Sequence, residues 1–212
     1  MLITISRQYA AGGTEVAEQV AAALGWRVVD NELVERVAAR AGLAPEDVAD
    51  REERVPTFVE RLARTLVAGT PELVVPPEAG GTVPALSEAD LVRITETVVA
   101  EIAAEGRVVM VGRAAPAVLA HRDALHVKLV APREHRIRTA AASLSVSVEE
   151  ATRILDDTDK MRARYHREYY HRDWHDPVNY YMVLNTAVLG FEGAAEVVVG
   201  EARRKWQVTS DK

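Results

Sequence analysis

The sequence lacks cysteine entirely among its 212 residues. A disulfide framework and a zinc site built on thiolates are therefore both excluded. Long apolar runs are also missing, because no segment approaches the roughly 18 apolar residues that a spanning helix needs. Residues 1–5 show neither the basic start nor the extended apolar stretch of a secretory signal. We therefore expect a cytoplasmic protein with no membrane association.

An excess of positive charge is absent as well. The 26 Lys and Arg residues are outnumbered by 32 Asp and Glu residues, which gives a formal net charge of −6. Nucleic acids and anionic membranes draw their affinity from basic protein surfaces, so neither is an expected partner. A small anionic ligand bound by local arginines remains compatible with this balance.

Length and composition indicate one globular domain. Apolar residues make up 48% of the chain and charged residues 27%, which is too hydrophobic for a disordered protein. A chain of this length suffices for one core with an attached lid. We predict a single domain over residues 1–212, and the oligomeric state stays open, with a homodimer as one possibility.

Short apolar runs alternate with segments of helical periodicity. The expected strands are residues 2–5, 27–29, 108–111, 125–130 and 182–184. The expected helices begin near Thr14, Ser87, Ala114, Pro132 and Ser147, with further helices at residues 32–40, 55–67 and 191–206. Such alternation predicts an α/β fold, in which helices cover both faces of a parallel sheet.

Residues 68–86 interrupt this alternation. Their prolines and the Gly80-Gly81 pair cannot continue a helix. A loop of this length is uncommon in a compact domain unless it has a function. We expect a flexible flap or an arm that contacts a partner.

A glycine-rich turn follows the first strand directly, at residues 7–14. In a parallel sheet this turn directs backbone amides and the positive end of a helix to one point, where a phosphate can bind. Against the pattern G-x-x-x-x-G-K-[ST], Gly12 and Thr14 match, but Gly13 takes the place of the lysine and Arg7 that of the first glycine. By spacing alone, a turn that serves only packing is an equal alternative. The Thr14 hydroxyl could bind magnesium, cap the helix, or do both.

Further motifs follow in a fixed order along the chain. They are ITISRQY at 3–9, LGW at 24–26, VD at 29–30, VGR at 111–113, DKMRARY at 159–165, DP at 176–177 and LNT at 184–186, with Trp174 and Tyr180 as expected anchors near the end. Together with the glycine pair, this series resembles the cytidylate kinase-like family, which carries a glycine in place of the loop lysine. The resemblance implies the three-layer fold of the nucleoside-monophosphate kinases, with a five-stranded parallel sheet, a phosphate loop and a helical lid at about 147–176.

The same resemblance implies a set of site residues. ATP with Mg²⁺ would lie on the loop, and Arg113 would bind the acceptor phosphate. The run D-x-x-D-x-x-R at residues 156–162 implies that Asp159 contacts the acceptor ribose and Arg162 its phosphate. The cofactor-binding candidates are Ala11, Gly12, Gly13, Thr14, Arg164 and Arg167.

Phosphoryl transfer independently requires cations around the transferred group. The catalytic candidates are Arg7, Arg113 and Arg162. Each has a plainer alternative: Arg113 could form a surface ion pair at a strand end, and Arg164 and Arg167 could belong to a solvated stripe on the lid helix. Asp30 could bind an acceptor hydroxyl or cap the following helix.

Two departures from the family pattern bear on activity. Gly13 cannot reach the terminal phosphates, so either an arginine replaces the lysine or the site binds nucleotide without rapid transfer. Val111 and Ala114 stand where cytidylate kinases carry aspartates. We therefore predict a phosphotransferase that moves the γ-phosphoryl group of ATP to a nucleoside monophosphate such as CMP. The alternatives are a catalytically weak nucleotide sensor or regulatory pseudokinase, and a kinase for a different small acceptor.

Overall fold

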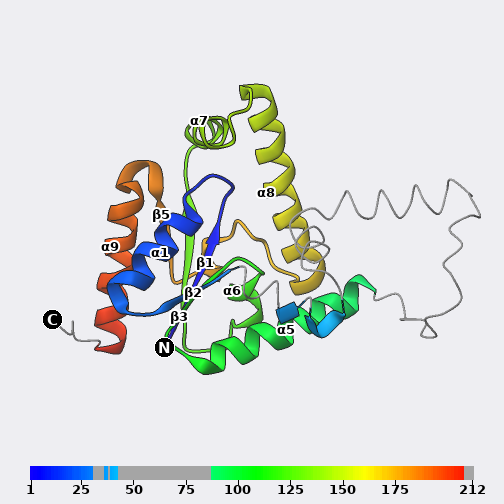
Figure 1. Cartoon of the computed structure of the whole chain (residues 1–212), viewed down its shortest axis with the longest axis vertical. Helices are drawn as coiled ribbons and strands as arrows, with labels where there is room; N and C mark the ends of the chain where they lie inside the picture. Colours follow the sequence, from blue (N-terminus) through cyan, green and yellow to red (C-terminus); the bar gives the residue numbers. More distant parts are fainter. Residues whose placement is uncertain (31–35, 38, 43–86, 208–212) are drawn as a thin grey trace, which may run out of the picture.

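Five apolar runs of the sequence form the strands of one parallel sheet (Figure 1). The computed structural model describes residues 1–30, 36–37, 39–42 and 87–207. Within them the strands are β1 (Leu2–Arg7), β2 (Arg27–Val29), β3 (Val108–Val111), β4 (Leu125–Val130) and β5 (Met182–Asn185). Their order is β2-β3-β1-β4-β5, and every neighbouring pair is parallel. The predicted fold class is confirmed.

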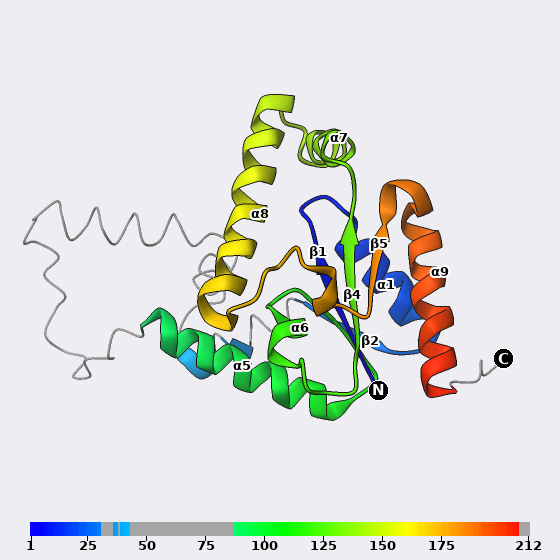
Figure 2. The ribbon, with the colours of Figure 1, turned by 180° about the vertical axis from the view of Figure 1, so that it is seen from behind.

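Helices α1 (Gly13–Leu24) and α9 (Thr186–Trp206) cover one face of the sheet, as Figure 2 shows from behind. Alternate residues of β1, β3 and β4 point to this face and pack against both helices. The predicted helix at residues 191–206 is confirmed, and one further helical turn from Thr186 precedes it. A break at Gly190, with φ 70° and ψ 171°, separates this first turn of α9 from the rest.

Helices α5 (Glu88–Glu105) and α6 (Ala115–Val118) lie on the other face, where they share an apolar cluster with residues of β1, β2 and β3. The predicted start of a helix near Ser87 is confirmed, since Ser87 is the N-cap of α5 and forms a complete capping box with Asp90. Further along β1 and β4 this face carries Thr4, Ser6, His126 and Lys128, and the segment between α8 and β5 contacts it through Trp174 and Tyr180. This segment contains the short 3₁₀ helix η1 (Pro177–Asn179).

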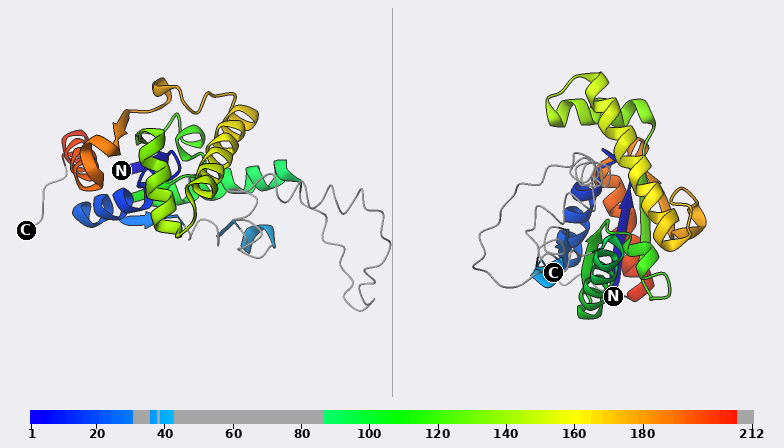
Figure 3. Two further views of the ribbon diagram at one scale, coloured as in Figure 1. Left: turned by 90° about the horizontal axis from the view of Figure 1, so that it is seen from above. Right: turned by 90° about the vertical axis from the view of Figure 1, so that its right-hand side faces the viewer.

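Helices α7 (Arg133–Leu144) and α8 (Val148–Tyr170) pack against each other beyond the carboxyl ends of the strands, and α8 then passes α6 (Figure 3). Ser147 caps α8 by accepting a hydrogen bond from the Glu150 amide. Pro132 is the N-cap of α7, not its first helical residue as predicted. None of the described helices combines the length and the apolar character needed to cross a bilayer.

The predicted helix at 55–67 and the predicted loop at 68–86 lie outside the described residues. Of the predicted helix at 32–40, residues 36–37 and 39–40 are described and are helical.

Candidate functional site

The glycine-rich turn joins β1 to α1 at the centre of the sheet, where parallel α/β folds bind ligands. Ala10, with φ 57°, and Gly12, with φ 80°, bend the backbone through the left-handed region. The Gln8 amide donates to Leu129 O at 3.0 Å, and the Ala11 amide donates to Gln8 O at 3.2 Å. Ala11 therefore shapes the turn, and its side chain is buried.

A hollow of about 400 Å³ lies above this turn, and we call it the loop hollow. It is lined by residues 7–10 and 12–15 on one side and by Thr139, Ser143, Ile154, Thr158 and Arg162 of α7 and α8 on the other. The first amides of α1 lie at the loop, and first-turn amides have no acceptor within their own helix. This arrangement suits an anionic ligand.

Thr14 is exposed and lines the loop hollow. It does not cap α1, because the N-cap is Gly12, which makes no side-chain cap bond. Among the described residues, no group of three or more His, Cys, Asp or Glu side chains could hold a metal ion. A magnesium ion at the loop hollow would therefore depend on oxygens such as the Thr14 hydroxyl and on ligand phosphates, which is how Mg²⁺ commonly binds.

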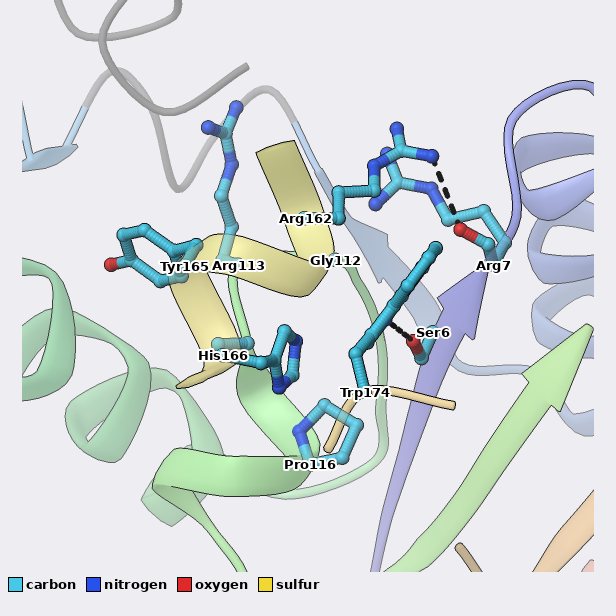
Figure 4. A pocket seen from close by; sticks show the side chains of 10 residues that line it. Ser6, Arg7, Gly112, Arg113, Pro116, Arg162, Tyr165, His166 and Trp174 are labelled. Carbon is cyan, nitrogen blue, oxygen red and sulfur yellow. Dashed lines mark hydrogen bonds between the residues drawn. The ribbon is translucent and has the colours of Figure 1, made fainter. Parts of the chain in front are cut away.

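A second, narrower hollow of about 50 Å³ lies at the ends of β1 and β3, and we call it the arginine hollow (Figure 4). Its lining comprises Ser6, Arg7, Gly112, Arg113, Ala114, Pro116, Arg162, Tyr165, His166 and Trp174. The turn that follows β3 has three successive residues at positive φ: 76° at Gly112, 52° at Arg113 and 48° at Ala114. Strain of this kind at non-glycine residues often marks a functional site.

Arg7 and Arg162 line both hollows. Arg162 Nη1 donates to Arg7 O at 3.1 Å. The two guanidinium groups lie near one another in Figure 4, whereas Arg113 extends away from them, on the side of Tyr165. The structure therefore brings two of the three catalytic candidates together at the junction of the hollows, with the third at the edge of the arginine hollow.

Asp159 connects α8 to the glycine loop. Its carboxylate accepts from Arg136 Nη1 at 2.7 Å and from the Tyr9 amide at 2.8 Å. Arg136 also donates to Ala131 O and Tyr9 O. The side chains of this ion pair are only 6% and 13% exposed. Sequence reasoning missed Arg136, because its partners lie on other elements and no local pattern marks it.

The remaining candidates lie elsewhere. Arg164 and Arg167 are exposed on another side of α8 and line neither hollow. Arg164 pairs with Glu168 at 2.7 Å, as expected of a solvated stripe. Asp30 is half-buried after β2 and is not among the described residues that line either hollow.

A buried polar layer supports the floor of the arginine hollow. Trp174 Nε1 donates to Ser6 Oγ at 2.9 Å, and the ammonium of Lys128 lies 3.6 Å from the Trp174 ring centroid. Lys128 also donates to Trp174 O and to the Tyr180 hydroxyl. The expected anchoring by Trp174 and Tyr180 is confirmed, since both are buried. A lysine within the apolar run of β4 was the available sequence signal for this layer.

Burial changes the protonation of this layer. It lowers the pKa of Lys128 to about 7 and that of His166 to about 4, because both cations lose hydration. The Lys128 charge further lowers the pKa of His166. His166 is thus neutral at pH 7, and arginines supply the positive charge of the arginine hollow.

The fold is similar to solved structures from bacteria. An uncharacterized protein from Eubacterium ventriosum matches with a TM-score of 0.66 and 17% identity, over 95% of this chain and 97% of that chain. Shikimate kinase from Bacteroides thetaiotaomicron matches with a TM-score of 0.53 and 15% identity, over 98% of both chains. At these identities the likeness shows a shared fold.

No curated protein matches the chain at a significant level. The model of the cytidylate kinase-like family, in contrast, matches residues 2–188. This match spans the glycine loop, both hollows and helix α8. The chain therefore belongs to the cytidylate kinase-like family.

Proposed function

We propose that the protein transfers the γ-phosphoryl group of ATP to a nucleoside monophosphate such as CMP. Family membership supports a phosphate-loop kinase that uses nucleotides. The observation that carries the proposal is the meeting of the two hollows at Arg7 and Arg162. A donor above the loop and an acceptor in the arginine hollow would have their phosphates at this junction.

In this proposal the triphosphate lies in the loop hollow. Gly12, with φ 80°, lets the loop adopt its turn, and the amides at the start of α1 stabilise the charge of the phosphates. The Thr14 hydroxyl is the protein ligand proposed for Mg²⁺, with phosphate oxygens and water as the others. When bound, the ion would neutralise charge on the phosphates.

The acceptor phosphate would bind Arg113 and Arg162. Asp30 stays a prediction for an acceptor hydroxyl. Asp159 stays a prediction for the ribose, although its carboxylate already binds Arg136 and the Tyr9 amide. Binding of the triphosphate by Arg164 and Arg167 would require α8 to move, as lids of such enzymes do.

The reaction needs no protein nucleophile. An acceptor phosphate oxygen attacks the γ-phosphorus, the bond from this phosphorus to the bridging oxygen of ATP breaks, and ADP leaves. Catalysis then consists of positioning and of charge stabilisation by arginine at the junction.

Calorimetric titration with Mg²⁺-ATP and with CMP, followed by a product assay over a panel of nucleoside monophosphates, tests the proposal. We expect both ligands to bind and a diphosphate to form. Arg162→Ala should lower turnover about 10²–10³-fold. Arg153→Ala is the matched control on the same helix, because this arginine is 65% exposed and pairs with Glu150 and Asp157. ATP binding without any product would favour the nucleotide sensor, and absence of ATP binding would refute the proposal.

A further inference from the structure

The side chain of Arg7 occupies the space that a side chain at position 13 would need. A β-carbon built on Gly13 would lie 2.6 Å from Arg7 Cγ and 3.0 Å from Arg7 Cδ, and real β-carbons essentially never approach other atoms to within 3.0 Å. Gly13 is the first residue of α1 and does not have a positive φ. Its backbone therefore tolerates any L-residue, and the Arg7 side chain is what excludes one.

The far end of Arg7 lies against a second glycine. A β-carbon on Gly112 would overlap Arg7 Nη1 and lie 3.1 Å from Arg7 Cζ. The stem of Arg7 thus lies over the glycine loop, and its guanidinium lies over the turn that follows β3. This course explains why Arg7 lines both hollows.

We infer that Arg7 supplies the positive charge that the lysine of a phosphate loop would supply, an inference that rests on the proposed nucleotide binding. The usual pattern has glycine at the position of Arg7 and lysine at the position of Gly13. In this chain a basic residue, Arg7, stands at the glycine position of the pattern, and Gly13 stands at the lysine position. The two positions are in contact. The two mismatches are therefore one compensated change, in which Gly13 leaves the room that Arg7 requires.

The exchange also changes what the charge can do. A lysine is a point charge on a flexible stem, whereas a guanidinium is a planar fork that binds phosphate oxygens in pairs. Arg7 extends from the end of β1, where its carbonyl oxygen accepts from Arg162. Because the side chain lines both hollows and its guanidinium lies against Gly112, we place this group at the junction, where it can bind oxygens of the donor and of the transferred group.

A thermal-melting cycle on the full-length protein tests the packing half of this inference without any ligand. Gly13→Ala should lower the melting temperature of the wild type, because Arg7 must leave its position. In an Arg7→Gly background, which also removes the β-carbon of residue 7 that would lie 3.2 Å from the new one, the same substitution should raise it by about 1–3 °C, because alanine favours helix over glycine. Equal effects of Gly13→Ala in both backgrounds would overturn the packing of Arg7 on Gly13.

Mg²⁺-ATP titration and turnover test the charge half. Arg7→Ala and Gly13→Ala should each lower kcat/KM for ATP about 10²–10³-fold. Arg7→Gly/Gly13→Lys, which restores the usual pattern, should recover at least about tenfold over Arg7→Gly. If the wild type binds ATP and forms product but Arg7→Ala matches it, the inference is overturned and the proposed function stands. If the wild type does not bind ATP, the proposed function and the charge role of Arg7 fail together, while the melting cycle still decides the packing.

Discussion

Replacement of Asp159 by alanine tests whether this carboxylate holds α8 to the glycine loop and α7 or contacts the substrate. The substitution removes the partner of Arg136, whose side chain is only 6% exposed, and leaves that guanidinium buried without its carboxylate. It also removes the acceptor of the Tyr9 amide. Breaking a buried ion pair from one side costs about 3–5 kcal/mol. For a protein of this size the melting temperature should then fall by about 6–20 °C.

Asp156 provides a matched control one turn earlier on α8. It pairs with Arg133 of α7 at 2.6 Å, just as Asp159 pairs with Arg136, but the two side chains are 52% and 48% exposed. Exposed pairs contribute about 0–1 kcal/mol. Asp156→Ala should therefore lower the melting temperature by no more than about 4 °C. The two variants share residue type, helix and partner type, and differ in burial and in the contacts that Asp159 alone makes with the Tyr9 amide and with Arg162.

Scanning calorimetry on both variants measures this difference, and a product assay at a temperature where both are folded separates the two roles. If Asp159 holds α8, its substitution lowers stability much more than that of Asp156. If Asp159→Ala melts like Asp156→Ala but has a higher KM for the acceptor, the structural reasoning is refuted and ribose binding is favoured.

Three further predictions concern buried groups. The His166 imidazole takes up its proton near pH 6.5 in the unfolded chain but only near pH 4 in the folded protein. The free energy of unfolding should therefore fall by up to about 3 kcal/mol as the pH drops from 6.5 to 4. Melting curves of His166→Leu should lack this loss. Burial lowers the pKa of Lys128 from 10.5 to about 7, so the ammonium loses its proton at a lower pH in the folded protein than in the unfolded chain. The free energy of unfolding should therefore rise from about pH 7 to about pH 9. Denaturant titrations of Lys128→Met should show a smaller rise. Gly12→Ala should lower the free energy of unfolding by about 2 kcal/mol or more, because φ is 80° at this position and the new β-carbon would overlap the Phe191 ring. Gly200→Ala is the control, because Gly200 lies in an open helical position of α9. In thermal melts this control should have a melting temperature equal to that of the wild type or higher.

The sequence predicted the sheet well because its signals are local. The run at residues 108–111 is apolar throughout, and all four residues are buried in β3. The glycine loop followed from its place directly after β1. Helix boundaries were less predictable at the start of α9, where a turn that begins at Thr186 precedes the predicted helix at 191–206 and is separated from it by the non-helical Gly190.

The site was less predictable, because its contacts join residues far apart in the chain. The bond from Trp174 to Ser6 spans 168 positions, and the bond from Tyr9 to Asp159 spans 150. No periodicity in one segment indicates such contacts. The aspartate-arginine run on α8 could be recognised from sequence, but that Asp159 is bound by Arg136 and the Tyr9 amide could not.

The absence of the loop lysine was one of two features behind the sensor alternative. The contact between Arg7 and position 13 weakens this argument for a sensor. The positive charge that is missing at position 13 is present on Arg7, which is in contact with it, so the missing lysine need not disable the site. The other feature, the absence of aspartates beside the glycine-arginine turn, concerns the acceptor instead. Ala114 lines the arginine hollow with φ 48°, a conformation that aspartate adopts more readily than alanine. The backbone conformation therefore does not explain why alanine occupies this position. Whether the protein is a kinase or a sensor thus depends on which acceptor molecule binds in the arginine hollow.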